Sequence, residues 1–206
     1  MVSWYIHAIS LTHPRSSGNE SFVFKRVSKP FYELSQRLAA EFAGTRRLRM
    51  HTDCNQEQRI LVYPYFRDTL LGLIKDDSEV LFPERKKILR RVGEAIQELH
   101  RKEWIHIGTI PVPNCLPDLS MLTMLLFLAD IKPDNMLVNW TCDKDGPKTV
   151  TDVALGDFDI AFKSEGGKPR QTPYAIGNAM WRSPEGQTGR GVTKASDMYS
   201  FGLVVS

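Results

Sequence analysis

Acidic, amide and basic side chains lie close together in the stretch FLADIKPDNMLVNW, residues 127–140. Asp130, Lys132 and Asn135 fall within six positions, and a further acid, Asp157, follows in the stretch LGDFD. Carboxylate and amide oxygens suit Mg²⁺, and a lysine can neutralise a phosphate, so the combination suits chemistry on a phosphorylated ligand. Taken singly, each residue has a plainer interpretation as part of a turn beside a proline or as a loop acid. Their joint order and spacing favour the chemical interpretation.

Five short motifs, in chain order, make the sequence resemble the eukaryotic-type protein kinases. They are FVFK (22–25), DIKPDN (130–135), LGDFD (155–159), WRSPE (181–185) and SDMYSFG (196–202). The most specific part is DxKPxN followed by an Asp-Phe pair about twenty residues later. A lysine two residues after the first Asp is the serine/threonine-kinase pattern rather than the tyrosine-kinase pattern.

The resemblance implies a role for each of these residues in phosphoryl transfer. Asp130 would orient the attacking hydroxyl or accept its proton, and Lys132 would steady the transferred phosphate. Asn135 and Asp157 would bind Mg²⁺, and Lys25 would hold the α- and β-phosphates of ATP. Lys132, Asn135 and Asp157 would therefore also belong to the nucleotide site, and ATP and Mg²⁺ are the implied cofactors.

The sequence departs from the family pattern around the expected nucleotide site. Asp159 stands where the family has a glycine, which restricts the backbone at that position. No glycine-rich loop precedes Lys25, and a helix glutamate that should pair with Lys25 is not evident. Glu33 and Glu41 flank the expected register, where Gln36 falls.

Further departures concern regulation and completeness. The residue after His106 is isoleucine rather than arginine, so we do not expect control through a phosphorylated activation loop. Glu185 and Asp197 match structural positions of the family, and Asp197 would brace the backbone of the catalytic loop. The chain stops at Ser206, inside what should be the large helix of the C-terminal lobe, so we expect an incomplete domain that is marginally stable alone.

The catalytic-loop motif is split by residues 108–129, GTIPVPNCLPDLSMLTMLLFLA. Removing these 22 residues gives the continuous sequence WIHIDIKPDN, in which His106 directly precedes the motif. A genuine inserted loop is one interpretation, but a mostly apolar insertion at a catalytic centre would face water or disrupt the site. If Gly108 is encoded by GGT and Ala129–Asp130 by GCA-GAY, the segment has the ends of an intron and its removal regenerates Asp. We therefore hypothesise a translated short intron, of the kind common in fungi.

Hydrophobic periodicity and turn residues predict the elements that position these motifs. Alternation of apolar and polar residues predicts strands. Helices are predicted where a proline begins and a glycine ends a segment, or where apolar residues recur at helical spacing. In the long helix the stripe consists of Ile88, Leu89, Val92, Ala95, Ile96 and Leu99. The expected strands are 21–27, 46–52, 59–65, 135–140 and 151–158, and the expected helices are 31–44, 65–75 and 83–103.

Composition limits the partners and the compartment. The formal net charge of +3 is too small and too scattered to favour nucleic acid or an anionic membrane. Cys54, Cys115 and Cys142 form neither a disulfide framework nor a metal-ligand spacing, which favours a reducing compartment. The N-terminus has no signal-peptide pattern, and the apolar run 119–129 is too short to span a bilayer. We expect a cytoplasmic or nuclear protein, and oligomeric state stays open.

These observations predict an α+β, protein-kinase-like bilobal fold that is truncated. Residues 1–20 would be a lead, 21–63 a small β-rich N-lobe, 64–67 a hinge and 68–206 a partial helical C-lobe interrupted by 108–129. The function implied is ATP-dependent transfer of the γ-phosphate to Ser/Thr of a protein substrate, impaired in this chain. The alternatives are a non-catalytic, pseudokinase-like module that binds nucleotide or protein, and a small-molecule phosphotransferase of similar fold.

Overall fold

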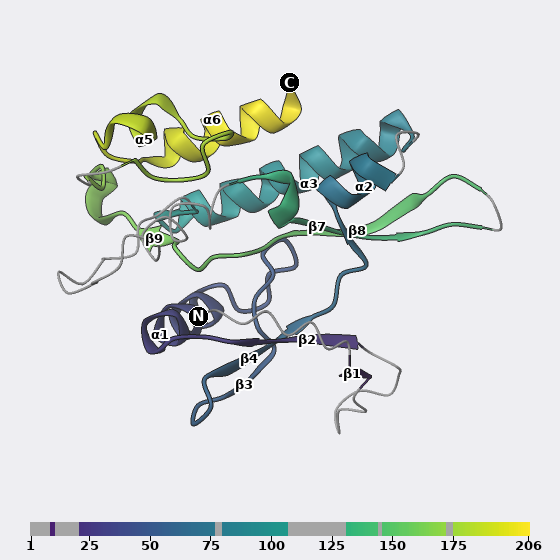
Figure 1. Cartoon of the computed structure of the whole chain (residues 1–206), viewed down its shortest axis with the longest axis horizontal. Helices are drawn as coiled ribbons and strands as arrows, with labels where there is room; N and C mark the ends of the chain where they lie inside the picture. The colour runs from purple at the N-terminus through teal and green to yellow at the C-terminus, as the bar shows by residue number, and fades with distance from the viewer. Residues whose placement is uncertain (1–8, 11–20, 77–79, 107–130, 144–145, 172–174) are drawn as a thin grey trace.

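The computed structural model describes residues 9–10, 21–76, 80–106, 131–143, 146–171 and 175–206. A sheet with one helix forms one part of the molecule, and a larger part contains most of the helices and a long hairpin (Figure 1). Residues 108–129 and Asp130 lie outside the described residues, so the intron hypothesis and the role of Asp130 stay predictions.

The first part is built around β2, Ser21–Arg26, the strand predicted at 21–27. It pairs antiparallel with β4, Ile60–Pro64, and the sheet order is β1-β2-β4-β3, where β1 is Ile9–Ser10. Helix α1, Lys29–Glu41, follows β2, and Pro30 lies in its first turn as the sequence predicted. Gly44 has a φ of +82°, which glycine adopts without steric cost, close to the predicted helix stop.

The prediction of a strand at 46–52 is wrong. The strand in this region is β3, Asp53–Asn55, which falls between the strands predicted at 46–52 and 59–65. Leu48 instead forms an isolated parallel bridge with Leu155, and the backbone N–H of Arg49 donates to the Leu155 carbonyl at 2.8 Å. The alternating pattern therefore reflects a contact with the second part of the molecule rather than a place in the first sheet.

The second part is organised around helix α3, Phe82–Arg101, which matches the long helix predicted at 83–103. Before it come β5, Asp68–Thr69, and α2, Leu70–Asp76, so the helix predicted at 65–75 begins later than expected. Leu89 is only partly buried. The other members of the predicted stripe are buried, namely Ile88, Val92, Ala95, Ile96 and Leu99.

The predicted hairpin is present as β7, Met136–Thr141, and β8, Thr149–Leu155, which pair antiparallel and form a sheet in the order β5-β7-β8. A short 3₁₀ helix, η1, Pro133–Asn135, leads directly into β7. Strands β6, Trp104–Ile105, and β9, Phe162–Lys163, form a separate two-stranded sheet. The hairpin packs against α3, so the motifs at its base are held on a rigid support.

The C-terminal segment contains η2, Glu165–Gly167, α5, Pro184–Thr188, and α6, Lys194–Val205. Thr193 caps α6 in a capping box with Ser196, which satisfies backbone donors at the start of the helix. Helix α6 contacts α3 and lies beside it in Figure 1.

A large hydrophobic core runs through both parts, beside a smaller cluster of Ile105, Phe162, Ile176 and Val192. The large core includes Leu38 and Phe42 of α1, Leu48, the buried side of α3, and Leu155 with Phe158 beyond the hairpin. No helix among the described residues is both long enough and apolar enough to span a membrane. The fold is therefore the α+β arrangement of a small β-rich part and a larger helical part, as the sequence predicted.

Candidate active site

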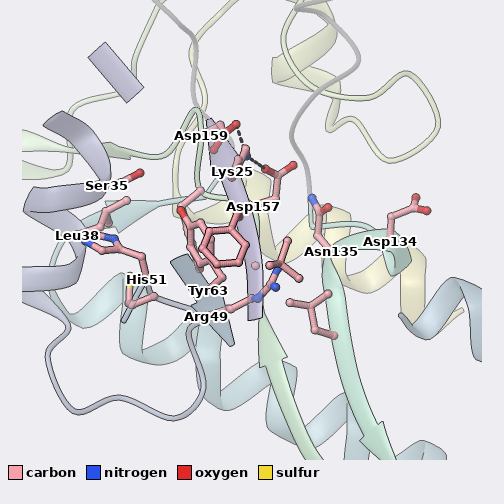
Figure 2. A pocket seen from close by; sticks show the side chains of 16 residues that line it. Lys25, Ser35, Leu38, Arg49, His51, Tyr63, Asp134, Asn135, Asp157 and Asp159 are labelled. Carbon is pink, nitrogen blue, oxygen red and sulfur yellow. Dashed lines mark hydrogen bonds and ion pairs between the residues drawn. The ribbon is translucent and has the colours of Figure 1, made fainter. Parts of the chain in front are cut away.

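A pocket lies between the first sheet and the base of the hairpin, and three predicted site residues line it. Lys25 comes from β2, Asn135 from η1 and Asp157 from the segment after β8 (Figure 2). Residues separated by 132 positions thus meet in one place. Asp159 and Arg49, for which the sequence suggested no site role, line the same pocket.

Lys25 pairs with the carboxylates of Asp157 and Asp159, which line the same pocket. Its Nζ lies 2.5 Å from Oδ2 of Asp159 and 3.2 Å from Oδ1 of Asp157, and its side chain is 10% exposed. Burial alone would lower the pKa of Lys25, but the nearby carboxylates of Asp159 and Asp157 outweigh it and raise the pKa. Lys25 is therefore a fixed cation inside the pocket at any physiological pH.

Asp159 is held in a low-dielectric environment. Burial raises its pKa, Lys25 opposes that rise, and the like charge of Asp157 adds to it. Two carboxylates thus share one ammonium group, and the shorter contact belongs to Asp159.

The backbone around Asp157 has an uncommon conformation that neighbouring contacts maintain. Asp157 has a φ of +60°, in the left-handed region, which Asp tolerates better than most residues. The preceding Gly156 donates its N–H to the Asn135 carbonyl at 2.9 Å, and its own carbonyl lies 2.9 Å from Nε2 of His106. The His106 ring also meets the Phe158 ring edge to face at 5.0 Å. Strain at a non-glycine residue that several contacts enforce is typical of functional sites.

Asn135 and Lys132 differ in their relation to the pocket. Asn135 is 6% exposed and lines the pocket at the start of β7. Lys132 lies just before η1 with its Nζ 4.0 Å from Oδ2 of Asp134, and it is not among the pocket residues. The structure therefore brings together Lys25, Asn135 and Asp157, while Lys132 lies to one side.

The two glutamates considered as helix partners for Lys25 are engaged elsewhere. Glu33 faces Lys29 at 3.8 Å on the exposed side of α1, and Glu41 pairs with Lys163 at 2.6 Å. Helix α1 contributes Ser35 and Leu38 to the pocket. No acid of α1 therefore contacts Lys25.

The structural roles predicted for Asp197 and Glu185 fit their contacts. Oδ2 of Asp197 accepts a hydrogen bond from the backbone N–H of His106 at 2.9 Å and lies 2.8 Å from Nε2 of His100. Oε1 of Glu185 accepts from the Ser196 hydroxyl at 2.5 Å. Both acids stabilise the C-terminal segment and do not line the pocket.

A second cation, for which no sequence pattern predicts a role, also lines the pocket. Arg49 donates from Nε and Nη2 to the Pro64 carbonyl, at 2.9 and 2.7 Å, and its guanidinium lies over the Tyr63 ring at 5.2 Å. Burial lowers the pKa of Arg49 to about 10. No motif could have identified this residue, because its place depends on the bridge between its segment and β8.

The pocket offers two of the protein oxygen ligands that Mg²⁺ prefers. Asn135 and Asp157 offer one amide and one carboxylate on the same pocket. Among the residues that the structure describes, no group of three or more His, Cys, Asp or Glu side chains could hold a metal ion alone. Mg²⁺ is usually bound through one or two protein oxygens together with substrate phosphates, so the two residues fit that mode rather than a permanent metal site.

No family model matches the chain. It is 39% identical over 155 residues to the serine/threonine-protein kinase PknA of Corynebacterium glutamicum, a match that covers 75% of this chain and 25% of PknA. It is 29% identical over 201 residues to a probable L-type lectin-domain containing receptor kinase V.3 of Arabidopsis thaliana, over 91% of this chain and 26% of that protein. The chain thus spans about a quarter of the length of these curated relatives.

A solved structure shows the same fold. The crystal structure of the yeast RNA Pol II CTD kinase CTDK-1 complex aligns with a TM-score of 0.63 over 91% of this chain and 54% of that chain, at 15% identity. Fold and sequence together define a protein-kinase-like domain. In sequence the chain resembles protein kinases over about a quarter of their length, and it has the fold of a solved kinase structure.

Proposed function

We propose that this protein transfers the γ-phosphate of ATP, in the presence of Mg²⁺, to a serine or threonine hydroxyl of a protein substrate. The observation that carries the proposal is the convergence of Lys25, Asn135 and Asp157 on one pocket from three separate segments. A buried fixed cation opposite an amide and a carboxylate is the arrangement that phosphoryl transfer requires, because that reaction depends on positioning and charge neutralisation.

Each residue has a definite part in the proposed reaction. Lys25 binds the α- and β-phosphates, and Asn135 with Asp157 would hold Mg²⁺, which neutralises the triphosphate when bound. Asp130 takes the proton of the attacking hydroxyl. The new bond forms between that oxygen and the γ-phosphorus, the bond to the bridging oxygen breaks, and ADP leaves. Lys132 steadies the transferred group.

A second candidate is a non-catalytic module that binds nucleotide or a partner protein. Two observations favour it: Asp159 and Asp157 both engage Lys25, and residues 108–129 separate His106 from Asp130 in sequence. Binding would then occur without transfer. The kinase and a nucleotide-binding, non-catalytic module would both bind ATP. Only the kinase would also transfer phosphate.

The proposal includes the domain layout and the compartment. The N-lobe would span about 21–63, the hinge 64–67 and the partial C-lobe 68–206. An ATP-dependent enzyme with exposed free thiols at Cys54 and Cys142 suits a reducing, ATP-containing compartment such as the cytoplasm or nucleus.

Thermal unfolding with and without Mg-ATP tests the nucleotide site. At about a hundred times the dissociation constant, a ligand that binds only the folded state stabilises it by about 2.7 kcal/mol, a rise of about 5–10 °C in Tm for a domain of this size. Lys25→Met and Asp157→Asn should each abolish the shift. Lys29→Met is the matched control, since Lys29 is 78% exposed on α1 and pairs with Glu33 rather than with a pocket residue among those that the structure describes.

Phosphate transfer from labelled ATP to a generic Ser/Thr protein substrate tests the reaction. Transfer that Asp130→Asn abolishes, with the Mg-ATP shift retained, supports the kinase proposal. A shift without transfer in the unaltered chain favours the non-catalytic candidate. No shift in the unaltered chain contradicts the kinase proposal and the nucleotide-binding form of the second candidate.

A further inference from the structure

Lys25 is held by the segment that follows β8 and not by α1. Asp159 makes an ion pair with Lys25 at 2.5 Å, shorter than the 3.2 Å pair of Asp157, and the side chains of Lys25 and Asp159 are largely buried, at 10% and 16% exposure. Charge-assisted contacts of this length between buried groups fix geometry strongly. The position of the Lys25 ammonium group is therefore set by Asp159.

Helix α1 presents no acid in that place. Its contributions to the pocket are Ser35 and Leu38, while Glu33 is 62% exposed and Glu41 lies against Lys163. Ser35 is the polar side chain that α1 places on the pocket wall (Figure 2). A carboxylate on α1 would therefore have to replace Ser35 to approach Lys25 from the helix side.

The position of Asp159 is itself well determined. The preceding Phe158 is 8% exposed and packs against the His106 ring, and the Ala161 N–H donates to the Phe158 carbonyl at 3.0 Å, which closes a turn around Asp159. An aspartate in place of glycine also restricts this turn. These contacts hold the backbone of Asp159, and with it the position of its carboxylate.

The carboxylates of Asp157 and Asp159 contact Lys25 at different distances. Asp157 approaches only through Oδ1, at 3.2 Å, whereas Asp159 takes the shorter contact. Because Asp159 positions the lysine, Asp157 can release Lys25 and bind Mg²⁺ instead. Lys25 then still has Asp159 as its partner. We propose that Asp159 is a positioning residue that holds Lys25 for the nucleotide phosphates, in the place that an acid of α1 would otherwise fill.

This inference rests on the proposed function, and nucleotide affinity in the full chain tests it. Asp159→Asn keeps the shape and removes the charge, and it should weaken Mg-ATP binding by about tenfold, because a misplaced phosphate-binding group loses its contacts. Adding Ser35→Glu to that variant should restore most of the affinity by supplying a carboxylate from α1. Asp152→Asn, which changes a 45% exposed acid on β8 away from the pocket, is the matched control and should bind as the unaltered chain does.

A second measurement needs no nucleotide. In a double-mutant cycle of unfolding with Lys25→Met and Asp159→Asn, the two changes should be coupled by about fivefold or more in the unfolding equilibrium constant. The corresponding cycle with Asp157→Asn should show weaker coupling, since that contact is longer. Glu33→Gln and Glu41→Gln should leave Mg-ATP affinity unchanged.

The outcomes separate this inference from the proposed function. If the unaltered chain binds Mg-ATP and Asp159→Asn binds equally well or more tightly, Asp159 does not position Lys25 and only this inference fails. If the unaltered chain binds no Mg-ATP, the proposed function fails, and the unfolding cycle still decides whether Asp159 is the principal partner of Lys25. Absence of coupling in that cycle overturns the pairing in either case. If Asp159→Asn does not fold, recovery of folding by the added Ser35→Glu supports the pairing, and failure to recover opposes it.

Discussion

The backbone N–H of His106 donates a hydrogen bond to Oδ2 of Asp197 at 2.9 Å, across 91 positions of sequence. The same oxygen lies 2.8 Å from Nε2 of His100 on α3. The Asp197 side chain is fully buried, so this acid on α6 joins the end of β6 to α3 without competition from water. The segment that leads toward the predicted catalytic loop is thereby anchored to the helical part.

Replacing Asp197 by alanine should destabilise the chain by about 3 kcal/mol, because the buried His106 N–H and the partly buried His100 ring would lose their acceptor. Urea unfolding at neutral pH measures the effect. Glu57→Ala, which removes an exposed acid between β3 and β4, should change stability by less than about 0.5 kcal/mol. Equal stability of the two variants would contradict a bracing role for Asp197.

Gly191→Ala should destabilise the chain by about 1–3 kcal/mol. Gly191 has a φ of +100°, and an added Cβ would lie 2.8 Å from Cβ of Pro169 and 3.0 Å from the Arg170 carbonyl oxygen. Gly202→Ala is the opposite case, since its Cβ would meet nothing within 4 Å and α6 is helical there, so a gain of up to about 1 kcal/mol is expected. Thermal unfolding of both variants should show shifts of opposite sign.

The stability of the chain should fall as the pH drops below about 6.5, in part because of His51. Burial lowers the pKa of His51, and the nearby Asp53 only partly opposes this. A base with a depressed folded-state pKa contributes stability above its unfolded pKa, and that contribution is lost as the pH falls toward the folded value. His51→Gln should therefore show a smaller loss of urea midpoint between pH 7.5 and pH 5.5. Equal losses in both proteins would exclude His51 as a cause.

Deleting residues 108–129 should raise phosphate transfer by about tenfold or more. The deletion joins Ile107 to Asp130 and makes the predicted catalytic-loop motif continuous in sequence, and displacements near 1 Å can already cost about a hundredfold in rate. Transfer to a generic Ser/Thr substrate, measured for both proteins at saturating Mg-ATP, tests this expectation.

A gene-level observation checks the same hypothesis independently. Any glycine codon other than GGT at position 108 removes the donor site and would contradict a translated intron. A transcript lacking the 22 codons would support it.

Elements with a strong local pattern could be predicted from the sequence. Strand β2, helix α3 and the β7–β8 hairpin carry their own periodicity, so their existence follows from neighbouring residues. The segment 46–52 has a similar alternation but finds its partner in Leu155, more than a hundred positions away. Local pattern cannot distinguish these two origins of alternation.

The site was predictable only in part. Motif spacing identified Lys25, Asn135 and Asp157, and the fold brings them to one pocket. The sequence marks Asp159 only as a departure from glycine, because an ion pair across 134 positions leaves no local signal. The chemical roles assigned to these residues, and to Asp130 and Lys132, stay predictions that the experiments above address.

The hydrophobic core shared by α1, Leu48 and α3 has a consequence for how the molecule comes apart. Two subdomains with separate interiors could melt one after the other, whereas a continuous interior ties their melting together. Heating should therefore give a single calorimetric peak, with the van't Hoff and calorimetric enthalpies in agreement. Nucleotide bound at the pocket would then protect residues of both lobes against hydrogen exchange to a similar degree.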